Sequence, residues 1–169
     1  MTNQPTDSTL PVPVEDIDAD SFAPFGELID PPTGGGRVSL PTRLARDPAR
    51  GEAALRLITL HPITLSRAFT PAPERHPFSV QAFVPFGDVP LVCLAAPPGP
   101  APVRSGGFRA FRARPGQAIV LREGVWHLGM MCEGRTTTAL TFIHRLPDGS
   151  DTETCTPSGA LRLVPGSAS

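Results

Sequence analysis

The stretch Gly116-Gln-Ala-Ile-Val-Leu-Arg-Glu-Gly-Val-Trp-His127 decides the fold of this chain. It begins with an apolar run that reads as a strand, and Gly124 then permits the positive φ angle of a tight turn. Beyond the turn, Val125 and His127 share one face of the extended chain and Trp126 points to the other. The stretch therefore predicts a strand, a sharp turn and an inward imidazole, which is what a small β-barrel needs to carry a chemical group at its mouth.

The remainder of the chain is punctuated by Gly and Pro in a way that is typical of β proteins. The 22 prolines and 16 glycines favour many turns between short strands and argue against long helices. A short helical turn is expected after an N-cap at Asp20-Ser21, with Gly26 ending it. Strands are predicted at residues 27–30, 55–61, 80–86, 91–96, 108–114, 117–121 and 136–145. This pattern predicts an all-β closed or double-sheet architecture.

Length and composition set the domain organisation and exclude several classes of partner. We expect residues 1–13 to form a flexible tail, residues 14–165 a single domain, and the Gly34-Gly35-Gly36 segment an exposed excursion that ends near residue 53. A net charge of −1 argues against nucleic acid and anionic membranes as partners. The sequence shows no signal peptide and no apolar run near the ~20 residues of a membrane span. Three widely spaced cysteines then favour a reducing, cytoplasmic location.

A second polar cluster, Glu74-Arg75-His76 followed by Gln81, precedes and enters the strand predicted at 80–86. If it meets His127 in the barrel, the pocket holds two imidazoles, one carboxylate and one amide. That set could form a shell for a divalent metal from Glu74, His76, Gln81 and His127, or a metal-free acid/base cluster. Four arginines follow in the chain: Arg109, Arg112, Arg114 and Arg122. Most of them are expected to be solvated surface charges, although one could hold a substrate carboxylate.

These segments resemble the two motifs of cupin proteins. Gly116, Gly124 and His127 fall in register with the second motif, and Arg122 takes its Pro position. The 74–81 segment is similar to the first motif, with Glu74, His76 and Gln81 standing at its first His, second His and Glu positions, and Gly87 one residue early. The resemblance implies an all-β cupin-type jelly-roll barrel, a double-stranded β-helix with one or two short helices.

Three blocks also resemble the ureidoglycolate lyase family in order and spacing: Ser21–Ile29, Glu74–Pro85, and Arg109–Phe111 followed by Gln117 and Gly124–His127. The resemblance implies a homodimer that releases urea from (S)-ureidoglycolate to give glyoxylate in allantoin catabolism, with a divalent metal such as nickel in some members. It implies His127, His76 and Glu74 as catalytic residues. The expected substrate-binding residues are Gln81, Phe83, Gln117 and Trp126.

The chain departs from the family pattern near the proposed pocket, and we expect these changes to remove polar groups there. Leu128 replaces a second His, Leu121 replaces a Tyr, and Ala118 replaces a Gly. Two alternatives therefore remain open from the sequence: a divergent cupin that binds a small carboxylate without catalysis, and a lyase that acts on a related hydroxy-acid or carbinolamide.

Overall fold

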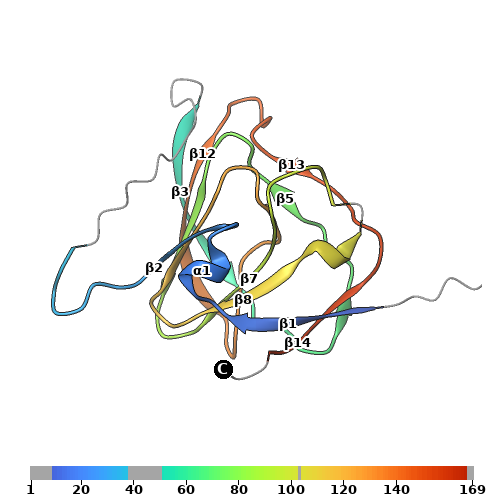
Figure 1. The fold of residues 1–169 in the computed structure, drawn as a ribbon. Helices are drawn as coiled ribbons and strands as arrows, with labels where there is room; N and C mark the ends of the chain where they lie inside the picture. Colours follow the sequence, from blue (N-terminus) through green and yellow to red (C-terminus); the bar gives the residue numbers. More distant parts are fainter. Residues whose placement is uncertain (1–8, 38–50, 103, 167–169) are drawn as a thin grey trace, which may run out of the picture.

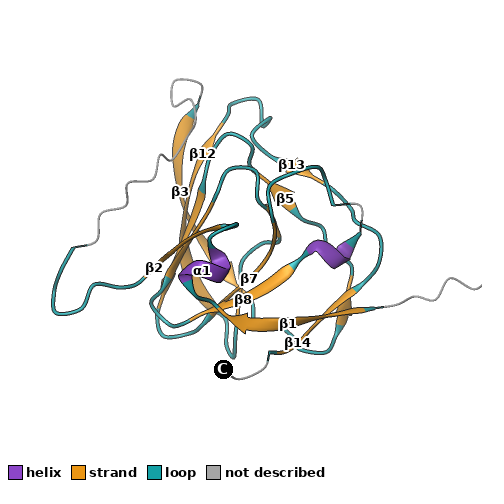
Figure 2. Ribbon diagram, in the orientation of Figure 1, coloured by secondary structure: helices purple, strands orange, loops and turns teal. Residues whose placement is uncertain are grey.

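Two facing β-sheets make up the fold (Figures 1 and 2), and the computed structural model describes residues 9–37, 51–102 and 104–166. The larger sheet runs β13-β5-β10-β7-β8-β1-β14-β4, with β11 paired to β7. Its strands are β1 (Leu10–Asp16), β4 (Ala68–Phe69), β5 (Glu74–Arg75), β7 (Leu91–Ala96), β8 (Arg109–Ala113), β10 (Trp126–His127), β11 (Met131–Cys132), β13 (Glu153–Thr154) and β14 (Leu161–Pro165).

The smaller sheet has the order β2-β9-β6-β12-β3. Its strands are β2 (Gly26–Ile29), β3 (Glu52–Leu60), β6 (Gln81–Phe86), β9 (Ala118–Leu121) and β12 (Thr137–Arg145). The helical parts of the described chain are the short helix α1 (Ala19–Phe22) and the 3-10 turn η2 (Ser105–Gly107). The fold is thus an all-β jelly-roll of the cupin type, and the predicted fold class is confirmed. Among the described residues, no helix is both long and apolar enough to span a bilayer.

The main core lies between the two sheets, and β7 shows why. All six of its side chains are buried, so its sequence reads as one continuous apolar run. Leu91, Cys93 and Ala95 face the smaller sheet and pack with Phe83, Ile119 and their neighbours. The alternate side chains of β7 pack on the far side of the larger sheet, in a second cluster that contains Trp126 and Leu161. A strand with both faces covered gives the larger sheet a rigid centre beside β10.

The N-terminal strand corrects the sequence prediction, because residues 10–13 belong to β1 and not to a flexible tail. Pro11 and Pro13 make this segment look irregular, yet Val12 and Val14 are buried. From Leu10 to Pro13, β1 pairs only with β14, and its pairing with β8 starts at Val14. The prolines therefore lack an N–H on a part of β1 where only one side is paired with another strand among the described residues. Residues 1–8 lie outside the described residues, and the single domain over 14–165 stays a prediction.

Other boundaries also differ from the sequence prediction. The helix cap is Asp18 rather than Asp20-Ser21, since the Asp18 side chain accepts the N–H groups of Asp20 and Ser21 at 3.0 and 2.9 Å. β3 begins at Glu52, and most of the excursion predicted after Gly36 lies outside the described residues. The strands that the sequence missed are β1, β4, β5, β10, β11, β13 and β14. Most are two residues long, too short to show a periodic pattern.

Candidate active site

The backbone of the Gly116–His127 stretch places His127 in the site. Gly124 adopts the positive φ that its predicted turn requires, 75°, and Gly116 also has a positive φ, 83°. The Gly124 N–H donates to the His76 carbonyl at 2.9 Å, which ties the turn to the second polar segment. Directly beyond it, β10 pairs with β5 so that His127 stands opposite Glu74. Residues that stand opposite in an antiparallel pair project from the same face, and His76, two positions after Glu74, can follow on that side.

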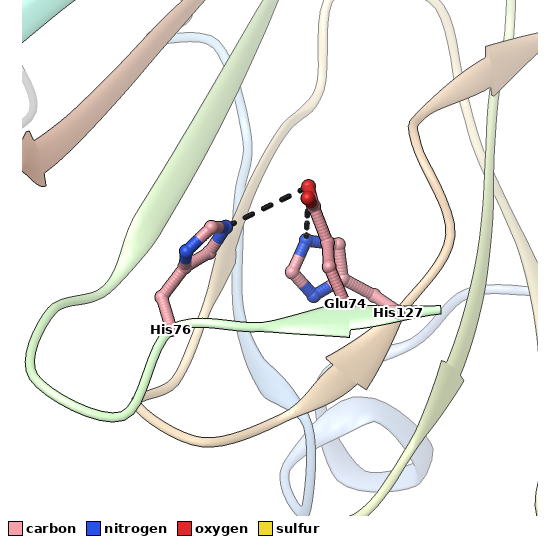
Figure 3. A group of neighbouring side chains, drawn as sticks. All are labelled: Glu74, His76 and His127. Carbon is pink, nitrogen blue, oxygen red and sulfur yellow. Dashed lines mark ion pairs between the residues drawn. The ribbon is translucent and has the colours of Figure 1, made fainter. Parts of the chain in front are cut away.

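Glu74, His76 and His127 consequently point toward one another, with the carboxylate between the two imidazoles (Figure 3). One Glu74 oxygen lies 3.7 Å from Nε2 of His76 and 3.7 Å from Nε2 of His127. The ring centroids of the two histidines are 5.4 Å apart. Gln81 reaches the same place from the smaller sheet, with its amide 2.8 Å from Nε2 of His127. The predicted convergence of these four residues is therefore confirmed.

Both imidazoles are oriented by the backbone. Nδ1 of His127 lies 3.0 Å from the Val125 carbonyl, and Nδ1 of His76 lies 3.2 Å from the Asp151 carbonyl. A carbonyl only accepts, so each Nδ1 carries the proton and each Nε2 presents a lone pair toward Glu74. Nε2 of His76 is buried without a hydrogen-bond partner. Two lone pairs and a carboxylate directed at one point form a suitable donor set for a metal ion.

Geometric spacing supports the same interpretation, since the ligand atoms of Glu74, His76 and His127 all lie within 4.8 Å of one another. The residues present therefore fit a metal ion, with the unpaired Nε2 of His76 as the specific observation. The orientation of the Gln81 amide depends on whether a metal ion is bound. Its oxygen suits a metal, whereas its NH₂ must face His127 when that imidazole is neutral and no ion is bound.

Electrostatics favour a neutral imidazole and an ionised carboxylate in this cluster. Burial lowers the pKa of His127 from 6.5 to about 4. The pKa of Glu74 is held below its usual value of 4.5, mainly by the His76 imidazole 3.7 Å away, and the charge of Arg145 acts in the same direction. Both groups are therefore in the state in which they bind metals or accept protons at neutral pH.

The buried His127 makes the protein's stability depend on pH. Between pH 6.5 and 4 the unfolded chain protonates this side chain and the folded chain does not, so the free energy of unfolding falls as the pH decreases. From pH 7 to pH 5 the loss amounts to about 2 kcal/mol. Urea denaturation in the presence of chelator should show that His127→Asn loses this part of the pH dependence. His61→Asn, at an exposed histidine, should keep it. Equal pH dependence in His127→Asn and the wild type would contradict the assignment.

A cavity of about 310 Å³ opens beside the cluster, between the two sheets. Glu74, His76, Gln81 and Phe83 line it, while His127 is 1% exposed and lies behind Glu74 and Gln81. The other lining residues come mostly from β3, β12 and the segment after β10: Arg56, Ile58, Thr59, Leu60, Gly129, Met130, Thr141, Ile143 and Arg145. Sequence reasoning missed Arg56, Thr141 and Arg145. Alternation along their strands was the available signal.

Two residues predicted to bind substrate lie elsewhere, which corrects the sequence analysis. Gln117 has its amide oxygen on the Arg114 N–H at 2.7 Å and its NH₂ on Asp30 at 2.7 Å, so it closes the turn between β8 and β9. Trp126 alternates with His127 and faces the second core, where its ring lies 4.6 Å from the Arg75 guanidinium carbon. Neither residue lines the cavity.

The four arginines singled out in the sequence form ion pairs or are exposed to solvent. Arg109 pairs with Glu15, Arg112 with Asp16 and Glu133, and Arg114 with Asp30, while Arg122 is exposed. None of the four lines the cavity, which agrees with the expectation that most of them are surface charges.

The departures from the family pattern have less effect on the cavity than the sequence suggested. Leu128 packs against the second core with Trp126, and Leu121 is buried in the main core. Neither position lines the cavity, so the expectation that these changes remove polar groups from the pocket is wrong for both. The reason is strand alternation, which turns residue 128 to the side opposite His127.

Comparison with known proteins identifies the family to which the chain belongs. The sequence model of the ureidoglycolate lyase family matches residues 9–163. Ureidoglycolate lyase 2 of Rhizobium meliloti is 32% identical over 85% of this chain and 91% of that protein. Ureidoglycolate lyase of Rhodobacter capsulatus is 40% identical over 68% of this chain and 74% of that protein. A crystal structure of a dTDP sugar isomerase from Desulfovibrio desulfuricans G20 aligns with a TM-score of 0.39 at 20% identity, over 79% of this chain and 83% of that one. By the match of nearly its whole length, the chain belongs to the ureidoglycolate lyase family.

Proposed function

We propose that this protein is a ureidoglycolate lyase, which releases urea from (S)-ureidoglycolate and leaves glyoxylate. The observation that carries the proposal is the cluster of Glu74, His76 and His127 beside a cavity sized for a small polar molecule. The curated relatives that share most of the chain bear the same name.

The reaction needs only a proton moved between two atoms of one substrate. Ureidoglycolate carries a hydroxyl, a carboxylate and a urea nitrogen on one carbon, so the hydroxyl proton leaves as the C–N bond breaks and a proton is added to the departing nitrogen. In the metal-free protein, Nε2 of His76 is unpaired and accepts the hydroxyl proton. Glu74, 3.7 Å away, can relay that proton to the urea nitrogen. No water is consumed.

We also propose that Glu74, His76 and His127, with the Gln81 amide oxygen, hold a divalent metal such as nickel. A bound ion would lower the pKa of the substrate hydroxyl. The two Nε2 lone pairs would then be occupied, and the ionised Glu74 carboxylate would accept the hydroxyl proton and return it to urea. Gln81, which lines the cavity, would orient the planar ureido group by hydrogen bonding, and Phe83 would pack against the substrate.

A urea-release assay tests the proposed function. Purified protein should convert ureidoglycolate to equal amounts of urea and glyoxylate, and metal analysis with a chelator arm should separate the metal-dependent version from the metal-free one. Thermal stabilisation by ureidoglycolate without turnover would contradict the proposal and favour a binding protein. Turnover of a different carbinolamide alone would indicate a lyase with another substrate.

We further propose that the protein forms a homodimer in the cytoplasm, acts in allantoin catabolism, and has neither nucleic acid nor a membrane as partner. The outer face of the smaller sheet supports a second copy as partner, since Leu55 and Leu57 on β3 and Val84 and Phe86 on β6 are 41–69% exposed. Cys93, Cys132 and Cys155 are all free, which supports a reducing compartment. A monomeric mass in light scattering at micromolar concentration would contradict the dimer.

A further inference from the structure

The cavity has a cationic side that neither the motifs nor the metal cluster includes. Arg56 on β3 and Arg145 at the end of β12 line it, together with Thr141 from the middle of β12. Antiparallel pairing places Arg56 directly opposite Thr141, and both project between the sheets. Glu74 and His76 belong to the larger sheet's side of the same cavity. A small substrate can therefore contact the arginines and the reaction centre at once.

The charge of these arginines is available to a ligand. Within the described part of the chain, the Arg56 side chain forms no ion pair or hydrogen bond, while its backbone belongs to the pairing of β3 with β12. Arg145 is held through Nε, which lies 2.8 Å from a carboxylate oxygen of Asp151. The terminal nitrogens of Arg145 have no partner among the described residues, and they are the donors that bind a carboxylate with two parallel hydrogen bonds.

Asp151 fixes Arg145 in this position and links it to the reaction centre. Asp151 is 1% exposed, and its other carboxylate oxygen accepts the Leu146 N–H at 3.0 Å. Its backbone carbonyl lies 3.2 Å from Nδ1 of His76, the contact that turns Nε2 of His76 toward Glu74. One buried residue thus positions both the guanidinium and the imidazole, so their separation is set by the fold.

Thr141 gives an independent sign of a ligand. Its side chain is 3% exposed, and its buried hydroxyl has no hydrogen-bond partner among the described residues although Thr141 lines the cavity. A buried hydroxyl that stays unpaired lowers stability, and a ligand oxygen that accepts its proton would remove this penalty. The unpaired donor lies on the strand that also carries Arg145, opposite Arg56.

We propose that Arg56, Thr141 and Arg145 form a carboxylate-binding subsite, which holds the carboxylate of the substrate and directs its hydroxyl-bearing carbon toward Glu74 and His76. The identity of the substrate rests on the proposed function, whereas the subsite itself requires only a small carboxylate. Its preference is for anions, because a neutral amide in place of the carboxylate would leave two guanidinium groups facing a dipole.

Arg56→Gln is the primary test, because Arg56 has no partner within the described chain whose loss would disturb folding. KM for ureidoglycolate should rise at least about tenfold, the effect of losing a charged hydrogen bond, while kcat changes little. Arg145→Lys should also raise KM, since a lysine keeps the charge near Asp151 but loses the forked geometry. Arg114→Gln, at an exposed arginine outside the cavity, is the matched control and should leave KM unchanged.

Thr141→Val separates binding from folding. If the hydroxyl serves only a ligand, valine should leave the thermal midpoint of the free protein equal or higher and raise KM by roughly threefold to tenfold. A lower midpoint with unchanged KM would show that the hydroxyl is structural and would overturn its place in the subsite.

Glyoxylate binding makes the test independent of turnover. Glyoxylate should raise the thermal midpoint of the wild type and stabilise Arg56→Gln much less. If the wild type binds glyoxylate in this way but releases no urea, the subsite stands and the proposed reaction fails. If urea is released and KM is unchanged in both arginine variants, the reaction stands and the subsite is overturned. Glyoxylate binding that is lost with chelator but kept in the arginine variants would assign the carboxylate to a metal and likewise overturn the subsite.

Discussion

Replacement of His127 or His76 by alanine is expected to lower kcat for ureidoglycolate at least about 100-fold, the lower end of contributions from positioned acids and bases. Nε2 of each imidazole lies 3.7 Å from the same Glu74 oxygen, so each variant removes one of the two imidazoles that face the only carboxylate among the described residues that line the cavity. His76 lines the cavity directly, and His127 lies behind Gln81. Urea release under substrate saturation measures the effect.

Metal content distinguishes the two ways in which these histidines could act. If they are ligands, the alanine variants should lose bound metal, and excess metal should restore part of the activity. If His76 carries the proton, its variant should keep any metal, and added imidazole should restore turnover. His61→Ala, at an exposed histidine outside this cavity, is the control and should remain active. Wild-type turnover in His127→Ala would remove that residue from the mechanism.

Glu74→Gln is expected to have a comparable effect, again at least about 100-fold on kcat. The amide keeps the size of the side chain but cannot accept a proton and is a weaker metal ligand. Gln also differs from the wild-type group in charge, because the pKa of Glu74 is held low, chiefly by the His76 imidazole 3.7 Å away, so Glu74 is ionised at neutral pH. Urea release and bound metal, measured on the same samples, provide the test.

A neighbouring glutamate supplies the control for this variant. Glu153 on β13 pairs with Arg75 beside Glu74, and its side chain is 48% exposed. Glu153→Gln should change kcat little, because Glu153 does not line the cavity. Retention of more than about a tenth of wild-type activity in Glu74→Gln would exclude the carboxylate as the proton carrier, since acid–base roles contribute at least about 100-fold.

The sequence predicted the fold class and the central residues of the site. The apolar run of β7, the alternation of β6 and the positive-φ glycines at 116 and 124 are local signals, each produced by backbone sterics or burial along one segment. The pairing of β5 with β10 is not local. The sequence predicted only that the two motifs meet in one pocket, and the structure supplies the basis in the register of His127 with Glu74.

What the sequence by itself determined was therefore the position of half of the described strands, β2, β3, β6, β7, β8, β9 and β12, and the side chains that carry chemistry: Glu74, His76, Gln81 and His127. Only the tertiary structure decided which polar residues share their cavity. Gln117 and Trp126 were excluded because alternation and hydrogen bonding direct them elsewhere, and Arg56, Thr141 and Arg145 were included because β3 pairs with β12. Charge and hydrogen-bonding capacity belong to a residue type, but the neighbours that use them are set by strand register, which joins residues more than 80 positions apart.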